Sequence, residues 1–276
     1  MRLRATTTLA GVIGEPVRHS LSPVLHNAAF DALGLDWAFL AFEVPAGCVG
    51  PALNGVRALG IAGLSVTMPH KAAVAEAVDE LTPAADTLGA VNCVVNERGR
   101  LIGHNTDGPG FIDALAHDAG FSVAGRSCVV LGAGGAARAV IWALAESGAS
   151  EVVVVNRTMS AAQTAAALAG PVGSVGDVSA VRGADLVVNA TSVGMGAPGH
   201  LPIDADLLAA HQVVADLVYL PVDTGLLKAA RAAGAVAVDG VGMLAHQAAR
   251  AFALWTGQTA PIEVMITAAR HELRNA

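Results

Sequence analysis

Short apolar runs alternate with longer amphipathic segments along the chain, and this alternation predicts an α/β fold. In the first part of the chain, helices are predicted at 22–33, where Pro23 suits the first turn and Gly34 ends the segment, and at 70–81. The apolar runs predict strands at 9–13, 38–44, 62–67, 90–96 and 101–104. The turn at 97–100 joins the last two of them.

The pattern changes after residue 107. A helix opens at 108–110 and extends to Gly120. It is followed by a strand at 128–131, a glycine-rich turn, an alanine-rich helix at 137–147 and a strand at 152–155. Further strands are predicted at 186–189, 213–217 and 236–238, and helices at 243–255 and 262–272. No repeat or low-complexity linker divides the chain. We therefore predict a discontinuous domain of residues 1–107 and 242–276, into which residues 108–241 are inserted.

The glycine-rich turn and the end of the strand that follows it have the pattern of a dinucleotide site. Glycines between a strand and a helix let backbone N–H groups approach a pyrophosphate. The second strand ends at Asn156-Arg157, where an NAD site usually carries Asp or Glu for the ribose 2′-hydroxyl. A neutral amide and a cation suit a 2′-phosphate, so NADP(H) is the predicted cofactor. The turn itself comprises Gly132, Ala133, Gly134, Gly135 and Ala136.

Composition and charge exclude several classes of partner. The 276 residues carry a net charge of -7 and no Lys/Arg cluster, so nucleic acid and anionic membranes are poor candidates. We expect neither a transmembrane helix nor a signal peptide, because a run of about 18 apolar residues and an early h-region are both missing. Three cysteines in apolar surroundings predict buried thiols in a reducing compartment. Nine histidines lack metal-ligand spacing, and we expect no metal.

Two groups of polar residues outside the turn could carry chemistry. Ser20 and Ser22 stand at a predicted helix start, where both hydroxyls could bind a carboxylate, although Ser22 could equally cap the helix. Lys71 lies in the first turn of another predicted helix. The helix dipole there assists release of a proton, but a solvated surface lysine is the common alternative. His70 is a rival acid–base group, and Asp107 could either cap a helix or pair with Lys71.

Further polar positions admit two interpretations each. Asn92 interrupts an apolar strand, either for a structural hydrogen bond or to contact a substrate hydroxyl. The segment Asn189-Ala190-Thr191-Ser192 ends a strand of the inserted domain, where cofactor contact is favoured over a plain loop. Tyr219 and Gln247 could each be a satisfied core group or a ligand contact.

Short segments in a fixed order carry a resemblance along almost the whole chain, namely Ser20-Leu21-Ser22-Pro23, Thr67-Met68-Pro69-His70-Lys71, Asn92 with Asn105-Thr106-Asp107, Gly132 to Ala136, Asn156-Arg157-Thr158, Asn189-Ala190-Thr191-Ser192, Asp216-Leu217-Val218-Tyr219 and Gly242-Met243-Leu244-Ala245-His246-Gln247. In this order they resemble the shikimate dehydrogenase family. Each segment alone is weakly specific, but their shared order favours the functional interpretation of the residues above.

The resemblance implies a Rossmann-type NADP-binding domain, a discontinuous α/β substrate domain and a catalytic cleft between them. It implies reversible, NADPH-dependent reduction of 3-dehydroshikimate to shikimate in chorismate and aromatic amino-acid biosynthesis. Lys71 is then the proton donor and Asp107 its partner. We expect a cytoplasmic monomer or homodimer. Substrate contacts are implied for Ser20, Ser22, Thr67, Lys71, Asn92, Asp107, Tyr219 and Gln247, and cofactor contacts for the glycine turn, Asn156, Arg157, Thr158, Thr191, Leu217 and Gly240.

Two positions bear on specificity. Members of the family often carry a second basic residue four positions after the arginine, where this chain has Ala161, so the 2′-phosphate contact rests on Arg157. Relatives that use NAD with quinate tend to carry Asp soon after the arginine, and Thr in place of Ser22. Here the segment reads Thr158-Met159-Ser160, which favours NADP and shikimate. The alternatives are a quinate/shikimate dehydrogenase of broader specificity and a non-catalytic NADP-binding sensor without a catalytic pair.

Overall fold

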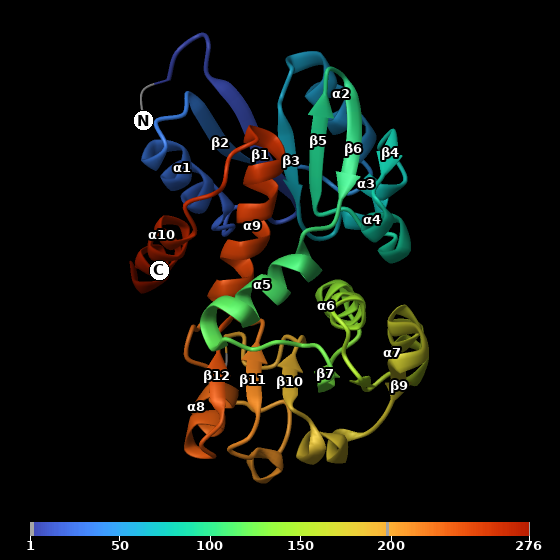
Figure 1. Cartoon of the computed structure of the whole chain (residues 1–276). Helices are drawn as coiled ribbons and strands as arrows, with labels where there is room; N and C mark the ends of the chain where they lie inside the picture. The colour runs from blue at the N-terminus through green and yellow to red at the C-terminus, as the bar shows by residue number, and fades with distance from the viewer. Residues whose placement is uncertain (1–2, 197–198, 276) are drawn as a thin grey trace. The chain divides into compact units, whose positions relative to one another are not determined.

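The computed structural model describes residues 3–196 and 199–275, which form two compact units (Figure 1). Unit 1 comprises Met1–Thr106 and Gln247–Ala276, and unit 2 comprises Asp107–His246. Unit 2 is therefore a contiguous insertion in unit 1. Each unit has its own sheet, covered by helices.

Unit 1 is built on a six-stranded mixed sheet in the order β2-β1-β3-β5-β6-β4. The first three of these strands are parallel, and β5 runs antiparallel to both of its neighbours. The β5–β6 hairpin turns at Arg98 and Gly99, which both have positive φ, 56° and 95°. The strands are β1 (Thr8–Gly14), β2 (Trp37–Glu43), β3 (Gly63–Val66), β4 (Glu80–Leu81), β5 (Cys93–Glu97) and β6 (Arg100–His104).

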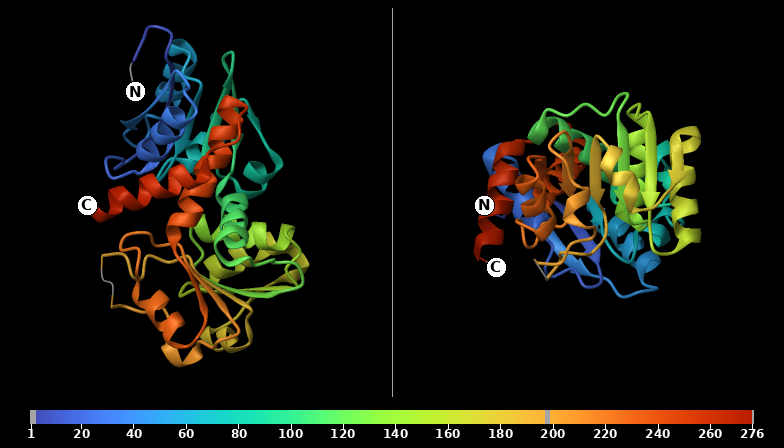
Figure 2. Two further views of the ribbon diagram at one scale, coloured as in Figure 1. Left: turned by 60° about the vertical axis from the view of Figure 1, so that its left-hand side comes forward. Right: turned by 90° about the horizontal axis from the view of Figure 1, so that it is seen from below.

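Helices cover both faces of the unit 1 sheet. One face packs on α2 (Val49–Leu59) and α3 (Lys71–Ala75) through an aliphatic cluster that includes Leu53 and Val74. The other face packs on α1 (Ser22–Ala32) and the C-terminal part of α9 (Gly240–Thr256). Figure 2 shows α10 (Ile262–Asn275) beside α1. The short α4 (Pro83–Leu88) precedes β5.

A ring cluster joins α1, β2 and α9. The His26 ring is fully buried and stacks on Phe39 with a centroid distance of 4.4 Å and an interplanar angle of 18°. Its distance to the Trp255 ring is 5.0 Å, and Phe30 stacks on Phe252 at 5.3 Å. Burial of these rings stabilises the unit, since each large aromatic ring removes about 150–250 Å² from water.

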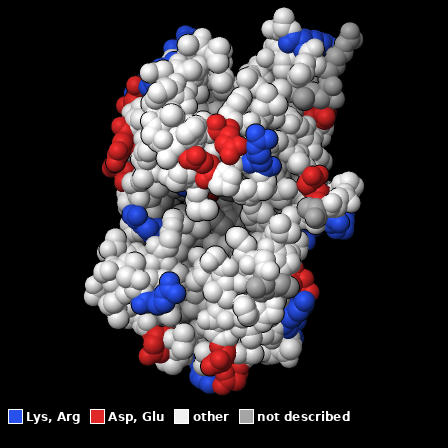
Figure 3. Space-filling view, turned by 180° about the vertical axis from the view of Figure 1, so that it is seen from behind, with Lys and Arg blue, Asp and Glu red and all other residues white. Residues whose placement is uncertain are grey.

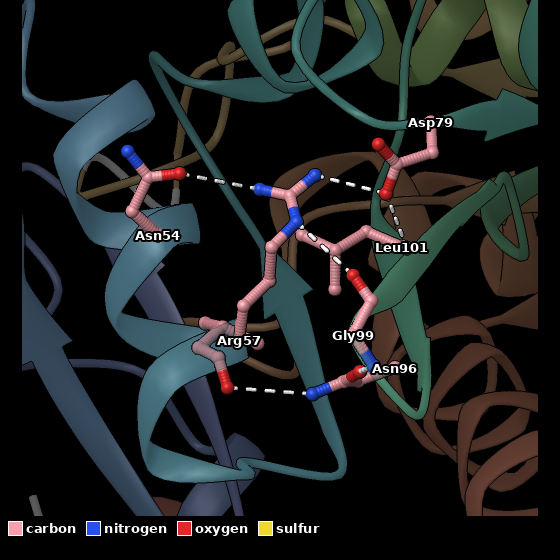
Figure 4. A network of polar contacts seen from close by, with 7 residues as sticks. Asn54, Arg57, Asp79, Asn96, Gly99 and Leu101 are labelled. Carbon is pink, nitrogen blue, oxygen red and sulfur yellow. Dashed lines mark hydrogen bonds and ion pairs between the residues drawn. The ribbon is translucent and has the colours of Figure 1, made fainter.

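A polar network fixes the β5–β6 hairpin to α2 (Figure 4). The Arg57 guanidinium donates to Gly99 O (3.1 Å) and to Asp79 Oδ2 (2.9 Å). Asp79 also accepts the Leu101 N–H at 2.7 Å, and this bond, followed by Arg57, lowers the pKa of Asp79. Asn96 Oδ1 accepts the Gly99 N–H at 2.7 Å. These bonds hold the turn that aligns β6 with the rest of the sheet.

Unit 2 is built on a six-stranded, all-parallel sheet in the order β12-β11-β10-β7-β8-β9. Counted within the unit, this is the order 3-2-1-4-5-6 of the Rossmann fold. The predicted Rossmann-type domain is thus confirmed. The strands are β7 (Ser127–Leu131), β8 (Glu151–Val155), β9 (Gly173–Val175), β10 (Leu186–Asn189), β11 (Val213–Asp216) and β12 (Val236–Val238).

Both faces of the unit 2 sheet are buried, which explains its valine-rich strands. Cys128 and Val130 point to the face covered by α5 (Asp107–Ala119), α6 (Gly135–Glu146) and α7 (Met159–Ala166). Val129 and Leu131 point to the other face, which is covered by α8 (Gly225–Ala232) and short 3-10 segments.

One predicted helix boundary is wrong. The helix predicted at 70–81 ends at Ala75, because the chain turns to pair Glu80–Leu81 with β6 and Asp79 bonds to Leu101. The predicted division at residue 242 and the division between the units, after His246, both lie within α9, which continues from Gly240 to Thr256. The pattern did not predict α2, α4, α7, α8 or β9.

Other expectations can be compared with the described residues. Cys93 and Cys128 are buried as expected, but Cys48 is exposed because it lies at the N-cap of α2. Over those residues, no helix has the length and apolar character needed to cross a bilayer. No group of three or more His, Cys, Asp or Glu side chains among them is placed to hold a metal ion. On the face shown in Figure 3, acidic and basic side chains are interspersed in small groups.

Candidate active site

The two serines lie together after the carboxyl end of β1. Ser20 Oγ donates to Ser22 Oγ at 3.2 Å, and the Ser22 N–H donates back to Ser20 Oγ at 3.3 Å. Ser22 is the first residue of α1, whose N-cap is Leu21 with no side-chain cap, so capping by Ser22 is not what the structure shows. The pair presents adjacent hydroxyls at a helix N-terminus, an arrangement suited to a carboxylate.

Thr67 and Lys71 follow the neighbouring strand β3. The Thr67 N–H donates to Ile13 O at 3.0 Å, which places this segment beside the end of β1. Lys71 is the first residue of α3 and is half-buried, and its carbonyl accepts the Val91 N–H at 2.9 Å. His70 is buried, and its Nε2 bonds to Val44 O at 2.7 Å. Because a carbonyl only accepts, that nitrogen is a donor, and His70 has a structural role.

Asn92 and Thr106 are clamped to each other. Asn92 Nδ2 donates to Thr106 Oγ1 at 2.9 Å, and the Thr106 N–H donates to Asn92 Oδ1 at 2.7 Å. Both residues are buried, and the clamp fixes the orientation of the Asn92 amide. Asp107, the next residue and the first of α5, is 7% exposed. The motif Asn105-Thr106-Asp107 identified this segment in the sequence. The hydrogen bonds between Thr106 and Asn92 were not predicted, because they depend on the register of the hairpin.

Five of the predicted substrate residues of unit 1 surround one end of its sheet. The parallel pairing of β1 and β3 brings the serine pair close to Thr67 and Lys71, and the antiparallel pairing of Ser65 with Cys93 adds Asn92. Gln247 also belongs to unit 1, whereas Asp107 and Tyr219 belong to unit 2. Tyr219 is half-buried, and burial raises the pKa of its hydroxyl.

The glycine turn lies at the switch point of the unit 2 sheet, between β7 and β10. Gly132 has φ +111°, and a Cβ there would lie 2.9 Å from Ala190 O, so only glycine fits without strain. Gly134 and Gly135 are exposed at the start of α6, with open space where a side chain would be. Ala133 and Ala136 flank them. The first N–H groups of α6 therefore face an open surface, as a pyrophosphate site requires.

The predicted ribose-binding residues follow β8. Asn156 Nδ2 donates to Thr158 O at 3.0 Å, and Arg157 and Thr158 are exposed at the start of α7. Thr158 is the N-cap of α7 but makes no side-chain cap hydrogen bond. An exposed guanidinium beside an uncapped helix start fits a phosphate.

Three more predicted cofactor residues lie in unit 2, but one hydroxyl is already used. Thr191 Oγ1 donates to Asn189 Oδ1 at 2.7 Å and accepts the Val193 N–H at 3.1 Å. The hydroxyl proton of Thr191 is therefore used within the loop, and a ligand contact would come from the second lone pair of Oγ1, from the backbone or from the methyl group. Leu217 is half-buried after β11, and Gly240 is the buried first residue of α9.

A parallel 3-2-1-4-5-6 sheet with an open glycine turn at its switch point is the architecture of dinucleotide-dependent oxidoreductases. Family models match three parts of the chain: a shikimate dehydrogenase substrate binding domain at residues 12–94, a shikimate/quinate 5-dehydrogenase at 114–195 and a shikimate 5′-dehydrogenase C-terminal domain at 240–270. A shikimate dehydrogenase (NADP(+)) of Methanopyrus kandleri is 48% identical over 98% of this chain and 97% of its own length. The chain belongs to the shikimate dehydrogenase family.

Solved structures show the same fold. Shikimate 5-dehydrogenase from Thermus thermophilus, in complex with NADP(H) and shikimate, has a TM-score of 0.90 and 40% identity, covering 96% of this chain and 99% of that one. Ligand-free 5-ketofructose reductase of a Gluconobacter species has a TM-score of 0.93 and 36% identity, covering 98% and 100%. The fold therefore occurs in proteins named for different substrates, and the side chains of the site determine which substrate is bound.

Proposed function

We propose that this chain is an NADP-dependent shikimate dehydrogenase, which reversibly reduces 3-dehydroshikimate to shikimate in chorismate and aromatic amino-acid biosynthesis. The observation that carries the proposal is the grouping of Ser20, Ser22, Lys71 and Asn92 around one end of the unit 1 sheet. A pair of hydroxyl donors suits the carboxylate of the substrate. An amide and an ammonium suit its ring hydroxyls and its carbonyl.

Each residue then has a defined task. Ser20 and Ser22 bind the carboxylate, and the clamped Asn92 amide donates to a ring hydroxyl. The Lys71 ammonium donates a proton from Nζ to the oxygen that gains negative charge as the carbonyl is reduced, and Asp107 orients that ammonium. Thr67, Tyr219 and Gln247 complete the substrate contacts.

Unit 2 is the proposed NADP(H)-binding domain. The turn from Gly132 to Ala136, with the open start of α6, holds the pyrophosphate. Asn156, Arg157 and Thr158 hold the 2′-phosphate, and the segments of Thr191, Leu217 and Gly240 contact the rest of the cofactor. When bound, NADPH supplies the hydride. With Ala161 in place of a second base, the 2′-phosphate contact rests on the Arg157 guanidinium.

The serine pair also separates this proposal from its rivals. A neutral sugar such as 5-ketofructose has no carboxylate for the serines to bind. Quinate carries a carboxylate, so a broader quinate/shikimate dehydrogenase differs from the proposal in substrate and cofactor preference. A non-catalytic NADP-binding sensor would bind the ligands without turnover. We further propose that the protein acts in the cytoplasm as a monomer or homodimer.

A matrix of steady-state rates tests the proposal. Oxidation of shikimate and quinate is measured with NADP+ and with NAD+, and reduction of 3-dehydroshikimate and 5-ketofructose with NADPH. We expect the highest kcat/KM in the oxidation assays for shikimate with NADP+, and in the reduction assays for 3-dehydroshikimate. A preference for quinate with NAD+, or for 5-ketofructose, would overturn the assignment of substrate. NADPH binding without turnover of any of the four would favour the sensor.

A further inference from the structure

A buried polar network lies beneath the carboxyl ends of β10 and β11 in unit 2. Its centre is Asp216, which is 1% exposed. Asp216 Oδ1 accepts hydrogen bonds from Asn189 Nδ2 at 2.8 Å and from the Val218 N–H at 3.1 Å. Its Oδ2 accepts the Thr224 hydroxyl at 2.7 Å. All of these donors are uncharged, and burial raises the pKa of Asp216.

Asn189 carries the network into the loop after β10. Its Nδ2 donates to Val193 O at 3.1 Å in addition to Asp216, and its Oδ1 accepts the N–H and the hydroxyl of Thr191 at 3.1 and 2.7 Å. The Asn189 amide is therefore fully bonded, and the peptides around Thr191 have one position relative to Asp216.

The network also fixes the loop after β11 and the start of α8. The bond from the Val218 N–H holds the peptide that follows Leu217. Thr224 is the N-cap of α8 and accepts the Leu227 N–H at 3.3 Å while it donates to Asp216. One carboxylate thus links β10, β11, their two loops and a helix.

Two glycines of the predicted cofactor site pack directly on these loops. A Cβ on Gly132 would lie 2.9 Å from Ala190 O, so the glycine turn rests on the peptide next to Thr191. A Cβ on Gly240 would lie 2.5 Å from Leu217 O, so the start of α9 rests on the loop after β11. With approaches this close, a displacement of either loop displaces the glycine segment above it.

We propose that Asp216 is a positioning residue for the dinucleotide site: it holds the Thr191 and Leu217 loops in the places where the cofactor meets them. The proposal rests on the proposed NADP(H)-binding role of unit 2. A carboxylate suits this position because both of its oxygens accept, so it can satisfy donors on several segments at once. An apolar side chain would fill the same space without the desolvation cost but would leave the loops unlinked.

The test compares the two ends of strand β11. Asp216→Asn keeps the shape of the side chain but replaces one acceptor with a donor. The matched control is Gln212→Leu, at the amino end of the strand, where the buried Gln212 side chain accepts the Ala209 N–H and donates to Val181 O. Both variants break buried hydrogen bonds of unit 2, but only the first faces the cofactor loops. Dissociation constants for NADPH are measured by its fluorescence, and Tm by calorimetry.

We expect Asp216→Asn to raise the Kd for NADPH about tenfold. Gln212→Leu should leave this Kd within about twofold of the wild-type value, even if both variants lower Tm by the same amount. Thr224→Val leaves the Asp216 carboxylate in place but removes one of its hydrogen-bond donors. This variant tests the positioning role if Asp216→Asn does not fold. We expect it to weaken NADPH binding, and Thr224→Ser, which keeps the hydroxyl, to restore it. An unchanged Kd in Asp216→Asn and Thr224→Val, or a Kd that follows Tm across all variants, would show that the network is only structural.

Binding and turnover separate this proposal from the proposed function. Wild-type protein that binds NADPH but does not oxidise shikimate overturns the proposed activity. The ratio of the NADPH dissociation constants of variant and wild type still decides the role of Asp216. Wild-type turnover with an unchanged Kd in the variants overturns the positioning role alone.

Discussion

Mildly acidic solution should destabilise unit 1 because of one buried imidazole. His26 is fully buried among Phe30, Phe39 and Trp255, and within the described part of the chain neither ring nitrogen has a hydrogen-bond partner. Burial lowers the pKa of His26 from 6.5 to about 3, because the charged ring would lose its hydration. The folded state therefore keeps this ring neutral over a pH range in which the unfolded chain protonates it.

The sign and size of the effect follow from that difference. Because the unfolded state binds the additional proton, stability is complete above the unfolded pKa of 6.5 and falls with pH toward the folded pKa near 3. At pH 5 the loss is about 2 kcal/mol, a sizeable part of the ~5–15 kcal/mol typical of a domain. Half-buried His104 acts with the same sign, since burial lowers its pKa. Carboxyls such as Asp79, whose pKa is lowered from 3.8, lose their contribution only in stronger acid.

Urea unfolding of His26→Leu and wild type at about pH 7 and about pH 5 measures the effect. Far-UV circular dichroism and tryptophan fluorescence are both recorded, so that coincident transitions justify two-state analysis. We expect the loss between the two pH values to be smaller in His26→Leu by about 2 kcal/mol. The control is His19→Leu, in the same unit, because His19 is exposed and this change should leave the wild-type dependence intact. Equal losses in wild type and His26→Leu would refute the reasoning.

Three further outcomes are expected. Lys71→Ala should lower kcat for shikimate by about 10²–10⁴ while its Kd for shikimate stays within about threefold, and full activity would exclude the proton-transfer role. Arg157→Ala should raise KM for NADPH about tenfold and leave KM for NADH unchanged, whereas equal effects would exclude the 2′-phosphate contact. Gly108→Ala should lower stability by about 1–3 kcal/mol, because the new Cβ would lie 2.5 Å from Ala139 O. Gly55→Ala, with open space at its Cβ, is the control and should not lower Tm.

Apart from β4 and β9, the strands lie close to where the sequence predicts them, because the hydrophobic pattern of a strand is local. β10 and β12 have the predicted bounds. β10 is a fully buried, valine-rich parallel strand, whereas β12 is a short edge strand of which only Val238 is buried. The helix α2 was missed because Gly50, Pro51 and Gly55 interrupt its pattern, although Leu53 and Val56 face the core. The early end of α3 depends on bonds to β6, which no local pattern records.

In the candidate site too, some features could be predicted from local sequence and others depend on the folded sheet. Ser20, Lys71 and the glycine turn stand in short motifs at element boundaries, so residue type and spacing marked them as candidates. The roles of Ser20 and Lys71 were implied by the family resemblance and stay predictions. The bonds of Thr106 to Asn92 and of Asp216 to Thr224 join segments that meet only in the folded sheet. Their partners therefore required the strand register. A strand that ends in Asn189 or Asp216 after several valines was the one available signal, because a buried polar side chain needs partners.

Unit 1 is assembled from both ends of the chain, and this sets an order of folding on the ribosome. Phe252 and Trp255, which complete the ring cluster around His26, are synthesised after the whole of unit 2. Unit 2 is contiguous, so its sheet can form first. The apolar side of α1 stays exposed until Phe252 and Trp255 have been synthesised. A pause or a premature stop in translation near residue 246 would therefore release a chain with a finished insert and an open host domain. Such a chain is a natural substrate for chaperones and proteases.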